Sequence, residues 1–177
     1  EKIRIKFLKG MDWLKTMIYN NEELSHFNDC ANGIAPKYSE LKIYANNLGL
    51  DLSIQENNNF YYQSVSGCIV FEDNDCHLVA DVAKIGPSYL PGHAHADTLS
   101  FELAIFGQRI IVNSGTSVYG ISLERSRQRS TAAHSTIEID GLNSSEVWSG
   151  FRVARRAIPF NIEICPHALK KNNVSFN

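Results

Sequence analysis

The spacing of hydrophobic and polar positions along the chain changes near residue 60. Before that point, apolar residues recur every three or four positions, which is typical of helices with one buried face. In residues 1–20 these positions are Ile5, Leu8, Trp13, Leu14, Met17 and Ile18. A second stripe follows Pro36 and ends near Gly49; its members are Leu41, Tyr44, Ala45 and Leu48. The pattern predicts two helices, and Ser39 is the candidate N-cap of the second.

After residue 60, short β-prone segments alternate with turns rich in Gly, Pro, Asn and Asp. Asn74-Asp75 and Gly107 separate neighbouring apolar runs, which predicts a hairpin at each place. So many short strands indicate an antiparallel β-sandwich or a jelly-roll-like domain. We therefore expect a helical segment in residues 1–50 and a mainly β domain, an antiparallel sandwich, in residues 51–177. The candidate strands are 60–65, 67–72, 76–83, 98–105, 109–113, 135–140 and 151–158.

Composition and charge exclude several classes of function. Hydrophobic residues make up 44% of the chain and charged residues 20%, as in ordinary soluble domains. The formal net charge of -2 provides no bulk basic field for nucleic acid binding. No apolar run approaches the ~20 residues that a transmembrane helix needs. The chain opens at Glu1 without a signal peptide and closes with a polar tail, so we expect both ends to be cuts within a longer protein.

The cysteines form no Cys-x-x-Cys pair. We interpret them as buried or free thiols. A bridge between Cys68 and Cys76 across a hairpin is the alternative that their spacing leaves open. The four are Cys30, Cys68, Cys76 and Cys165.

The stretch Pro91-Gly92-His93-Ala94-His95-Ala96-Asp97 carries the most informative chemistry. It lies where a turn leads into a candidate strand, and residues i and i+2 of an extended strand point to the same face. His93 and His95 are therefore expected to project into one cavity, with Asp97 next in line. Imidazoles so placed suit metal ligation and proton transfer beside a metal. The alternative is that both histidines are ordinary surface residues of a loop.

Two further residues are candidates for the same site. His134 precedes the alternating segment Ile137-Glu138-Ile139-Asp140, and Asn113 ends the candidate strand 109–113. An amide oxygen can complete a metal shell, although it binds more weakly than a carboxylate. The alternatives are a structural role for His134 and a turn role for Asn113, whose side chain would bond its own backbone.

Two known metal-binding patterns do not fit these residues. Metallo-β-lactamase-like hydrolases use His-x-His-x-Asp-His, but Thr98 occupies the final position here. Cupins use Gly-x5-His-x-His followed closely by Glu. The gap from Gly86 to His93 is one residue too long for that pattern, and Glu102 lies too far beyond His95. A cupin-like metalloenzyme is therefore disfavoured.

Several blocks in the second half of the chain, taken in order, resemble the heparinase II/III-like family. The likeness covers about residues 60–160, and residues 1–50 are similar to the last helices of the family's helical domain, with Asp29 in the junction loop. It implies an (α/α) toroid followed by an antiparallel β-sandwich, with the active site between them. It also implies β-elimination of uronic-acid-containing polysaccharides such as glycosaminoglycans or alginate. The blocks are Ser66-Gly67, Asp81 to Pro87, Pro91 to Asp97, Asn113-Ser114-Gly115-Thr116, Arg129 to His134 and Glu146 to Ala157.

The resemblance also implies roles for individual residues. His93 takes the place of the histidine that faces substrate at the catalytic centre. His95 and His134 take the places of zinc ligands, and Asn113 stands where many members have a metal-ligating Asp. The implied Zn2+ is structural and fixes the loops beneath the substrate. Asp97 is interpreted as a carboxylate that supports the ligands from behind rather than as a ligand.

Arginine and aromatic side chains supply candidates for substrate contact. Arg125, Arg127 and Arg129 alternate after a loop. Arg125 and Arg129 are candidates for pairing with carboxylates or sulfates of an acidic polysaccharide, and Tyr119 for stacking on a sugar ring. The alternatives are solvated surface charge for the arginines and packing for Tyr119. We interpret Phe151 as a core or domain-interface residue.

The sequence thus predicts the β-sandwich part of a metal-containing polysaccharide lyase in the periplasm or cell envelope, a location implied by the family alone. The family's catalytic Tyr and its carboxylate-neutralising Asn or His belong to the toroid upstream, so this chain by itself is expected to be inactive. The alternative is a catalytically silent carbohydrate-binding or assembly module of a polysaccharide-biosynthesis protein.

Overall fold

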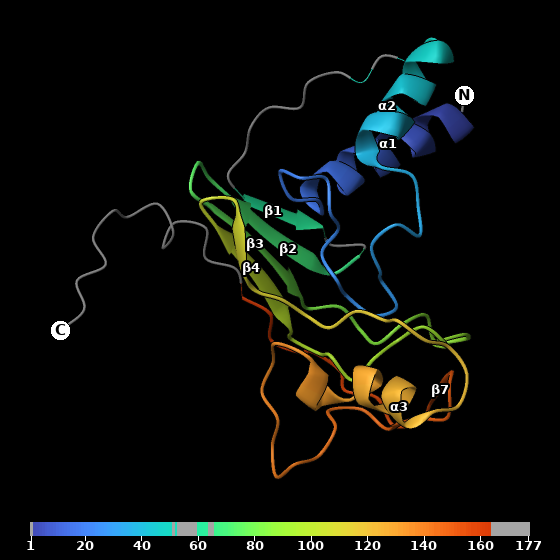
Figure 1. Ribbon diagram of the computed structural model, residues 1–177, viewed down its shortest axis with the longest axis vertical. Coiled ribbons are helices and arrows are strands. Elements are labelled where there is room, and N and C mark those ends of the chain that lie inside the picture. Colours follow the sequence, from blue (N-terminus) through green and yellow to red (C-terminus); the bar gives the residue numbers. More distant parts are fainter. Residues whose placement is uncertain (1, 51, 53–59, 64–65, 164–177) are drawn as a thin grey trace, which may run out of the picture.

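A five-stranded antiparallel sheet forms the centre of the computed structural model, which describes residues 2–50, 52, 60–63 and 66–163 (Figure 1). Its strands lie in chain order and each pairs antiparallel with the next. In the middle of the sheet, the fully buried Val70 pairs with the fully buried Val79. The strands are β1 (Phe60–Gln63), β2 (Cys68–Glu72), β3 (Cys76–Asp81), β4 (Phe101–Ile105) and β5 (Gln108–Ile111).

These strands confirm the first five candidate segments, with ends shifted by a few residues. The hairpin expected at Asn74-Asp75 joins β2 to β3, and Asp73 closes it by accepting hydrogen bonds from the amides of Asp75 and Cys76 at 3.0 and 2.7 Å. The hairpin expected at Gly107 joins β4 to β5. Phe106 and Gly107 both adopt positive φ there, at 49° and 74°, as a tight two-residue turn requires.

Two helices precede the sheet and lie together at one end of the molecule (Figure 1). They are α1 (Lys2–Thr16) and α2 (Tyr38–Asn47), as the apolar spacing predicts. The expected N-cap is wrong, because α2 begins one residue before Ser39, and Lys37 donates its amide to the Glu40 carboxylate at 2.8 Å. Ser39 instead bonds Glu22 through both its amide and its hydroxyl. None of the described helices is long and apolar enough to cross a membrane.

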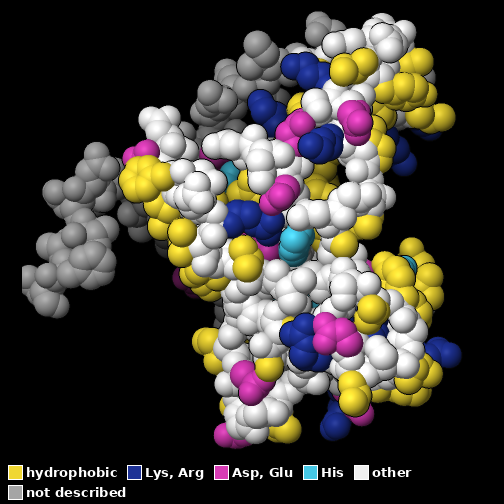
Figure 2. Space-filling model, viewed as in Figure 1, with side chains coloured by type: hydrophobic (Ala, Val, Ile, Leu, Met, Phe, Trp, Pro, Cys, Tyr) yellow, Lys and Arg dark blue, Asp and Glu magenta, His cyan; other side chains and the backbone are white. Residues whose placement is uncertain are grey.

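Apolar side chains remain exposed on the two helices. Space-filling Figure 2 shows hydrophobic atoms gathered at this end of the molecule. A helix that leaves large apolar side chains in water normally packs against something else in the complete protein. The exposed residues are Ile3, Ile5 and Trp13 on α1, Ile43 and Tyr44 on α2, and Leu48 directly after α2.

A small core ties the end of α1 to the sheet. Met17, Cys68, Val70 and Val79 form a buried cluster, against which Phe27 packs. Cys30, Cys68 and Cys76 are free thiols, which confirms that reading and excludes the Cys68–Cys76 bridge; Cys165 lies outside the described residues.

The second half of the chain differs from the expected strands. The segment 135–140 is turns and bends with a single bridge between Ile139 and Leu142, so that strand prediction is wrong. Of 151–158, only β7 (Arg152–Val153) is a strand, paired with β6 (Val147–Trp148). The alternating arginines lie on the helix α3 (Leu123–Arg129), which was not among the predicted elements and is followed by the 3-10 turn η1 (Thr131–Ala133).

The alternation of apolar and polar residues in 135–140 did not predict the structure, because no strand within the described residues pairs with this segment beyond the Ile139–Leu142 bridge. Helix α3 begins because the Ser122 hydroxyl accepts a hydrogen bond from the amide of Arg125 at 3.1 Å. Within the described residues, the sheets are β1–β5 and the pair β6–β7. The two facing layers of the predicted sandwich and the predicted toroid are not seen in this part of the chain.

Candidate functional site

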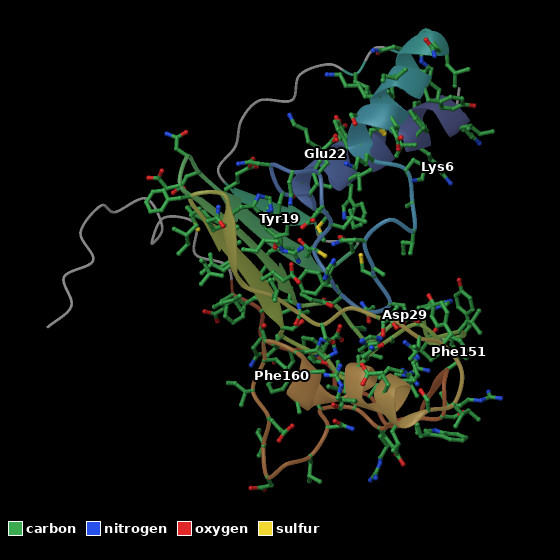
Figure 3. The ribbon with its side chains drawn as sticks, viewed as in Figure 1. Lys6, Tyr19, Glu22, Asp29, Phe151 and Phe160 are labelled. Atoms are coloured by element: carbon green, nitrogen blue, oxygen red, sulfur yellow. The ribbon has the colours of Figure 1, made fainter. Side chains whose placement is uncertain are left out.

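Three segments that are far apart in the sequence meet at one end of the sheet. The loop between α1 and α2 runs past the sheet and carries Asp29 to the region of α3 and β7 (Figure 1). Figure 3 shows Asp29 there, on the same side of the molecule as Phe151. The irregular segment 86–97 supplies His93 and His95, and α3 supplies Arg125.

Backbone contacts hold the Asp29 loop in place. Asn28 adopts a left-handed φ of 54°, which asparagine tolerates better than most residues. Its side-chain oxygen accepts the amide of His95 at 3.1 Å, and the carbonyl of Cys30 accepts the amide of Thr116 at 3.0 Å. Gly115 passes so close that a Cβ there would lie 2.5 Å from the carbonyl oxygen of Cys30. The loop therefore docks on two separate segments of the β domain.

The Asp29 carboxylate is the centre of the site. Its Oδ2 accepts a hydrogen bond from Nδ1 of His93 at 2.8 Å, and its Oδ1 accepts one from Nε2 of His95 at 2.8 Å. Arg125 adds a two-pronged ion pair, with Nη2 donating to Oδ2 at 2.9 Å and Nη1 donating to Oδ1. Burial opposes ionisation, but the bonds from His95, Arg125 and His93 outweigh it and hold the pKa of Asp29 well below its usual range. Asp29 is therefore an anion at neutral pH.

His95 and His134 form a buried pair. Their side chains face each other with Nδ1 of His95 3.2 Å from Nε2 of His134. Burial lowers the pKa of His95, although Asp29 opposes that shift. Burial and the neighbouring His95 lower the pKa of His134 to about 4. Both rings are therefore neutral at pH 7, which is the form that ligates metals.

This pair fits two positions of a zinc shell. Two imidazole nitrogens on a tetrahedral zinc, each at about 2.0–2.1 Å from the ion, lie about 3.3 Å apart. His95 also donates its opposite nitrogen to a carboxylate, as metal-binding histidines usually do. Within the described residues, however, no group of three or more His, Cys, Asp or Glu side chains is placed to hold a metal.

Asn113 lies near the pair but does not present its oxygen as a ligand. Its Oδ1 accepts a hydrogen bond from the amide of Ser135 at 2.9 Å, while its buried Nδ2 has no hydrogen-bond partner among the residues that the structure describes. The amide of Asn113 donates to the buried Glu102 carboxylate at 2.9 Å. The Asn113 oxygen is therefore not available as a third metal ligand in this arrangement, and the zinc assignment stays a prediction.

His93 is the exposed member of the site, with 73% of its side chain accessible. Tyr119 and Phe151 stand beside it, stacked on each other with ring centroids 5.6 Å apart. Both rings meet the His93 ring edge-on, at 6.1 and 5.9 Å. The Arg125 guanidinium lies 5.3 and 5.4 Å from the centroids of the same two rings. We call Tyr119 and Phe151 the aromatic wall; the two rings stay half-exposed.

The two arginines predicted to touch substrate are both buried, Arg125 completely and Arg129 to 1% exposure. Besides Asp29, Arg125 donates to the carbonyl of Gly150 and to the Thr116 hydroxyl. Arg129 donates to four carbonyls, those of Ala94, Trp148, Ser149 and Arg152. Their predicted role toward an acidic polymer stays untested, and their contacts here hold the protein's own loops. Arg127, between them, is exposed and pairs with Glu124.

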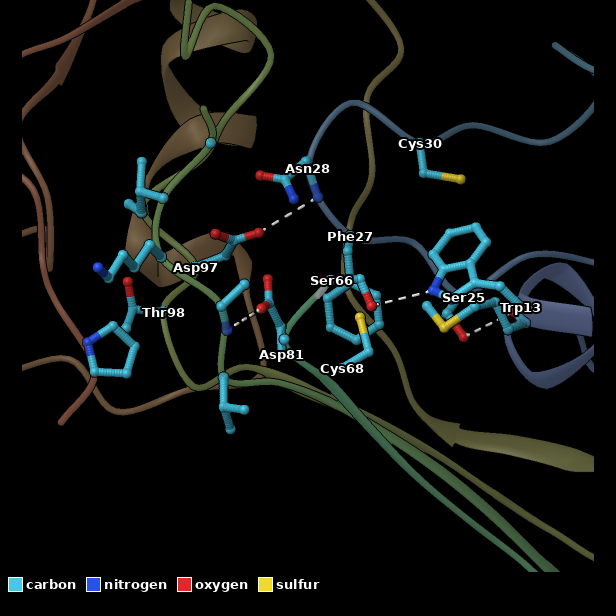
Figure 4. Close-up of a pocket in the computed structure, with 18 of the residues that line it drawn as sticks. Trp13, Ser25, Phe27, Asn28, Cys30, Ser66, Cys68, Asp81, Asp97 and Thr98 are labelled. Atoms are coloured by element: carbon cyan, nitrogen blue, oxygen red, sulfur yellow. Dashed lines mark hydrogen bonds between the residues drawn. The ribbon is translucent and has the colours of Figure 1, made fainter. Parts of the chain in front are cut away.

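Asp97 lies on the opposite side of the histidine segment and faces a cavity of about 830 Å3 (Figure 4). Its carboxylate accepts the amide of Asn28 at 3.3 Å, and burial together with the charge of Asp81 raises its pKa to about 7. Because the same Asn28 holds His95, Asp97 supports the histidines through the loop backbone. The cavity is lined by Trp13, Phe27 and Cys68 among others, and none of the three clustered histidines lines it.

Comparisons with known proteins identify the family of this chain and proteins with a similar fold. The family described as Heparinase II/III-like, C-terminal, matches residues 58–175. The chain belongs to the heparinase II/III-like family. Two solved structures of heparinase III, one of them with methylated lysines, match with TM-scores of 0.56 and 0.60. Each is 17% identical and covers 78% of this chain, so the likeness shows the fold alone. No curated protein sequence matches significantly.

This heparinase II/III-like chain spans about a quarter of the length of the heparinase III structures that it matches, because each alignment covers 25% of that protein. The structure brings together His93, His95 and His134, which the sequence had grouped. It also places Asp29 and Phe151 in the site, to which the sequence did not assign them. The polar loop between α1 and α2 carries no local signal of a hydrogen-bond partner 66 residues away or of a charged partner 96 residues away.

Proposed function

We propose that this chain is part of a polysaccharide lyase that cleaves uronic-acid-containing polysaccharide by β-elimination, with His93 at the reacting centre. The observation that carries the proposal is one exposed imidazole held beside a buried cluster of charged and titratable groups. His93 is 73% accessible, yet its Nδ1 is bonded to Asp29, which is 6% accessible. An exposed ring with one nitrogen fixed and the other facing outward suits proton transfer to or from a ligand.

The reaction needs three things. A proton α to the uronate carboxylate must be removed, the growing negative charge must be offset, and the leaving glycosidic oxygen must be protonated. Among the described residues, His93 is the one placed for proton transfer. The family resemblance assigns the Tyr and the carboxylate-neutralising Asn or His to a toroid upstream, so this chain is proposed to work only with that domain.

The exposed apolar residues on α1 and α2 support that arrangement. We propose that these helices are the last of an (α/α) toroid and that the sheet is one layer of an antiparallel β-sandwich, completed by other parts of the longer protein. The active site would then lie between the two domains, where the loop of Asp29 joins them. A periplasmic or cell-envelope location is proposed from the family alone.

We propose a structural Zn2+ on His95 and His134, with Asn113 as the third ligand after its oxygen leaves the Ser135 amide. The ion would fix the histidine segment beneath His93. The aromatic wall and, more indirectly, Arg125 and Arg129 would form the side of the sugar-binding cleft. The wall also suits the second candidate function, a catalytically silent carbohydrate-binding module, because aromatic faces bind sugars without chemistry.

The full-length protein tests the choice between these functions. It should convert uronate polymers, among them heparan, chondroitin, hyaluronan and alginate, into unsaturated products that are detected by absorbance. The variant His93→Ala should abolish turnover while leaving the fold, judged by circular dichroism, intact. Polymer binding without unsaturated product from any uronate polymer would favour the silent module instead.

A further inference from the structure

Asp29 bonds two different ring nitrogens on two histidines. It accepts from Nδ1 of His93 and from Nε2 of His95, each at 2.8 Å. An ionised carboxylate only accepts hydrogen bonds. Both contacted nitrogens must therefore carry hydrogen. In the neutral rings, the lone pair is then on Nε2 of His93 and on Nδ1 of His95, which are opposite atoms of the two imidazoles.

Each lone pair points where the proposed function needs it. Nε2 of His93 is the ring nitrogen left for a partner outside the protein, since it makes no hydrogen bond with any of the described residues and the side chain is 73% accessible. Nδ1 of His95 faces inward to Nε2 of His134, at 3.2 Å. One carboxylate thus leaves one lone pair directed outward on His93 and one directed inward, toward His134, on His95.

We propose that Asp29 is a positioning residue that sets the tautomers of both His93 and His95 and so couples the metal position to the reacting position. The proposal rests on the proposed lyase function for the meaning of the two lone pairs, although not for the tautomers themselves. Arg125 is the counter-charge in this arrangement. Its two bonds to the carboxylate keep Asp29 ionised and fix the plane of the carboxylate group.

A purely structural ion pair explains less. Asp29 and Arg125 alone would join the loop to α3, and an exposed imidazole adds little stability when it gives up water for one more bond. Glu102 offers the comparison within the same fold. That fully buried carboxylate is satisfied by Tyr19, Arg109 and two backbone amides, without an exposed histidine.

Nitrogen-15 spectra of the imidazoles test the proposal directly, because a ring nitrogen that carries hydrogen and one that carries a lone pair have well separated shifts. The protein is uniformly labelled and measured without substrate at about pH 8, above the ordinary histidine pKa of about 6.5. The signals of His93 and His95 are assigned by their loss in His93→Gln and His95→Gln. We expect hydrogen on Nδ1 of His93 and on Nε2 of His95.

In Asp29→Ala, His93 should lose this preference and show the averaged shifts of an exposed ring that exchanges between tautomers. Glu102→Gln is the matched control, since it weakens another buried carboxylate network and should leave the His93 shifts unchanged. Hydrogen on Nε2 of His93 in the wild type would overturn the proposal, and this measurement needs no variant to fold. The same His93 shifts in folded Asp29→Ala would also overturn it.

Lyase kinetics of the full-length protein provide a second, independent test. Asp29→Ala should lower kcat by about 10–100-fold with a smaller change in KM, the range typical when a residue behind a reacting or ligating group is removed. If the wild type lacks lyase activity but shows the expected tautomers, the proposed function fails and the tautomer assignment stands. If activity is present and Asp29→Ala keeps the wild-type kcat, the coupling is wrong.

Discussion

Arg125 and Asp29 form a buried, two-pronged ion pair that joins α3 to the loop between α1 and α2, across 96 positions of sequence. The Arg125 side chain is fully buried and that of Asp29 is 6% accessible. Bidentate geometry of this kind requires a guanidinium, because a lysine ammonium cannot present two parallel donors. The pair is a buried electrostatic link between the helical segment and the β domain.

The variant Arg125→Met should therefore be strongly destabilising. It leaves the Asp29 carboxylate buried with only the two imidazoles as partners, and breaking a buried pair from one side typically costs about 3–5 kcal/mol. Urea unfolding followed by circular dichroism gives the free energy of unfolding. The control is Arg127→Met on the same helix, whose exposed pair with Glu124 should matter little. Equal losses in the two variants would show that Asp29 does not depend on Arg125.

The sequence predicted the strands of the sheet but not this contact between distant segments. The five strands of the sheet were predictable because each is a short apolar run. The turns that join β2 to β3 and β4 to β5 also carry local chemistry, the Asp73 side chain in the first and the Gly107 backbone in the second. Helix α3 was not predicted, because most of its residues are charged or polar and two of its arginines are buried among carbonyls and one carboxylate. Such burial depends on partners from distant segments.

The candidate site was also predicted only in part. His93 and His95 were grouped by an i, i+2 argument that assumes a strand, yet the strand begins only at Phe101. They come together because both reach Asp29, which lies 64 and 66 positions earlier. The residue types could be read locally, whereas the carboxylate that organises them could not.

Zinc content tests the proposed metal ligands. Protein purified with zinc and then dialysed should retain the ion, whereas His95→Ala and His134→Ala should lose it, because each removes one nitrogen of the buried pair. Elemental analysis by mass spectrometry gives the zinc per chain. His77→Ala is the control, since His77 lies on β3 and interacts with Glu72 and Tyr19 rather than with the pair. The same zinc content in all four proteins would remove the metal assignment.

Gly150 is predicted to tolerate no side chain. A Cβ there would lie 2.6 Å from the carbonyl oxygen of Gly120, a backbone atom that cannot swing away. The carbonyl of Gly150 also accepts Arg125, so a shift would disturb the ion pair with Asp29. Gly150→Ala should therefore lower the melting temperature in calorimetry. Gly10→Ala in α1 meets nothing within 4 Å and should raise stability by up to about 1 kcal/mol, as alanine does in helix interiors.

The pKa of Cys68 leads to a prediction about thiol reactivity. Burial and the nearby Asp81 raise its pKa from 9.0 to about 11. A raised pKa keeps the thiol protonated, so at about pH 8 its thiolate fraction falls about 100-fold below that of an ordinary cysteine, and the thiolate is the reactive form. Iodoacetamide labelling followed by peptide mass spectrometry should modify Cys68 in the native protein far more slowly than in urea. Labelling at the same rate in both conditions would contradict the burial that raises its pKa.

The aromatic wall is the feature that distinguishes sugar binding from mere packing. Phe151 was interpreted from the sequence as a core or interface residue, but 43% of it is accessible and it stacks on Tyr119 beside His93. If the wall holds a sugar ring, Phe151→Ala should weaken ground-state and transition-state binding alike, so KM rises and kcat changes little. A tenfold rise corresponds to about 1.4 kcal/mol. Trp148→Ala serves as the control, because it removes an aromatic residue that is 57% exposed and, within the described part of the chain, makes no ring contact with His93. An unchanged KM in Phe151→Ala, measured on the full-length enzyme, would show that the wall packs against protein instead of sugar.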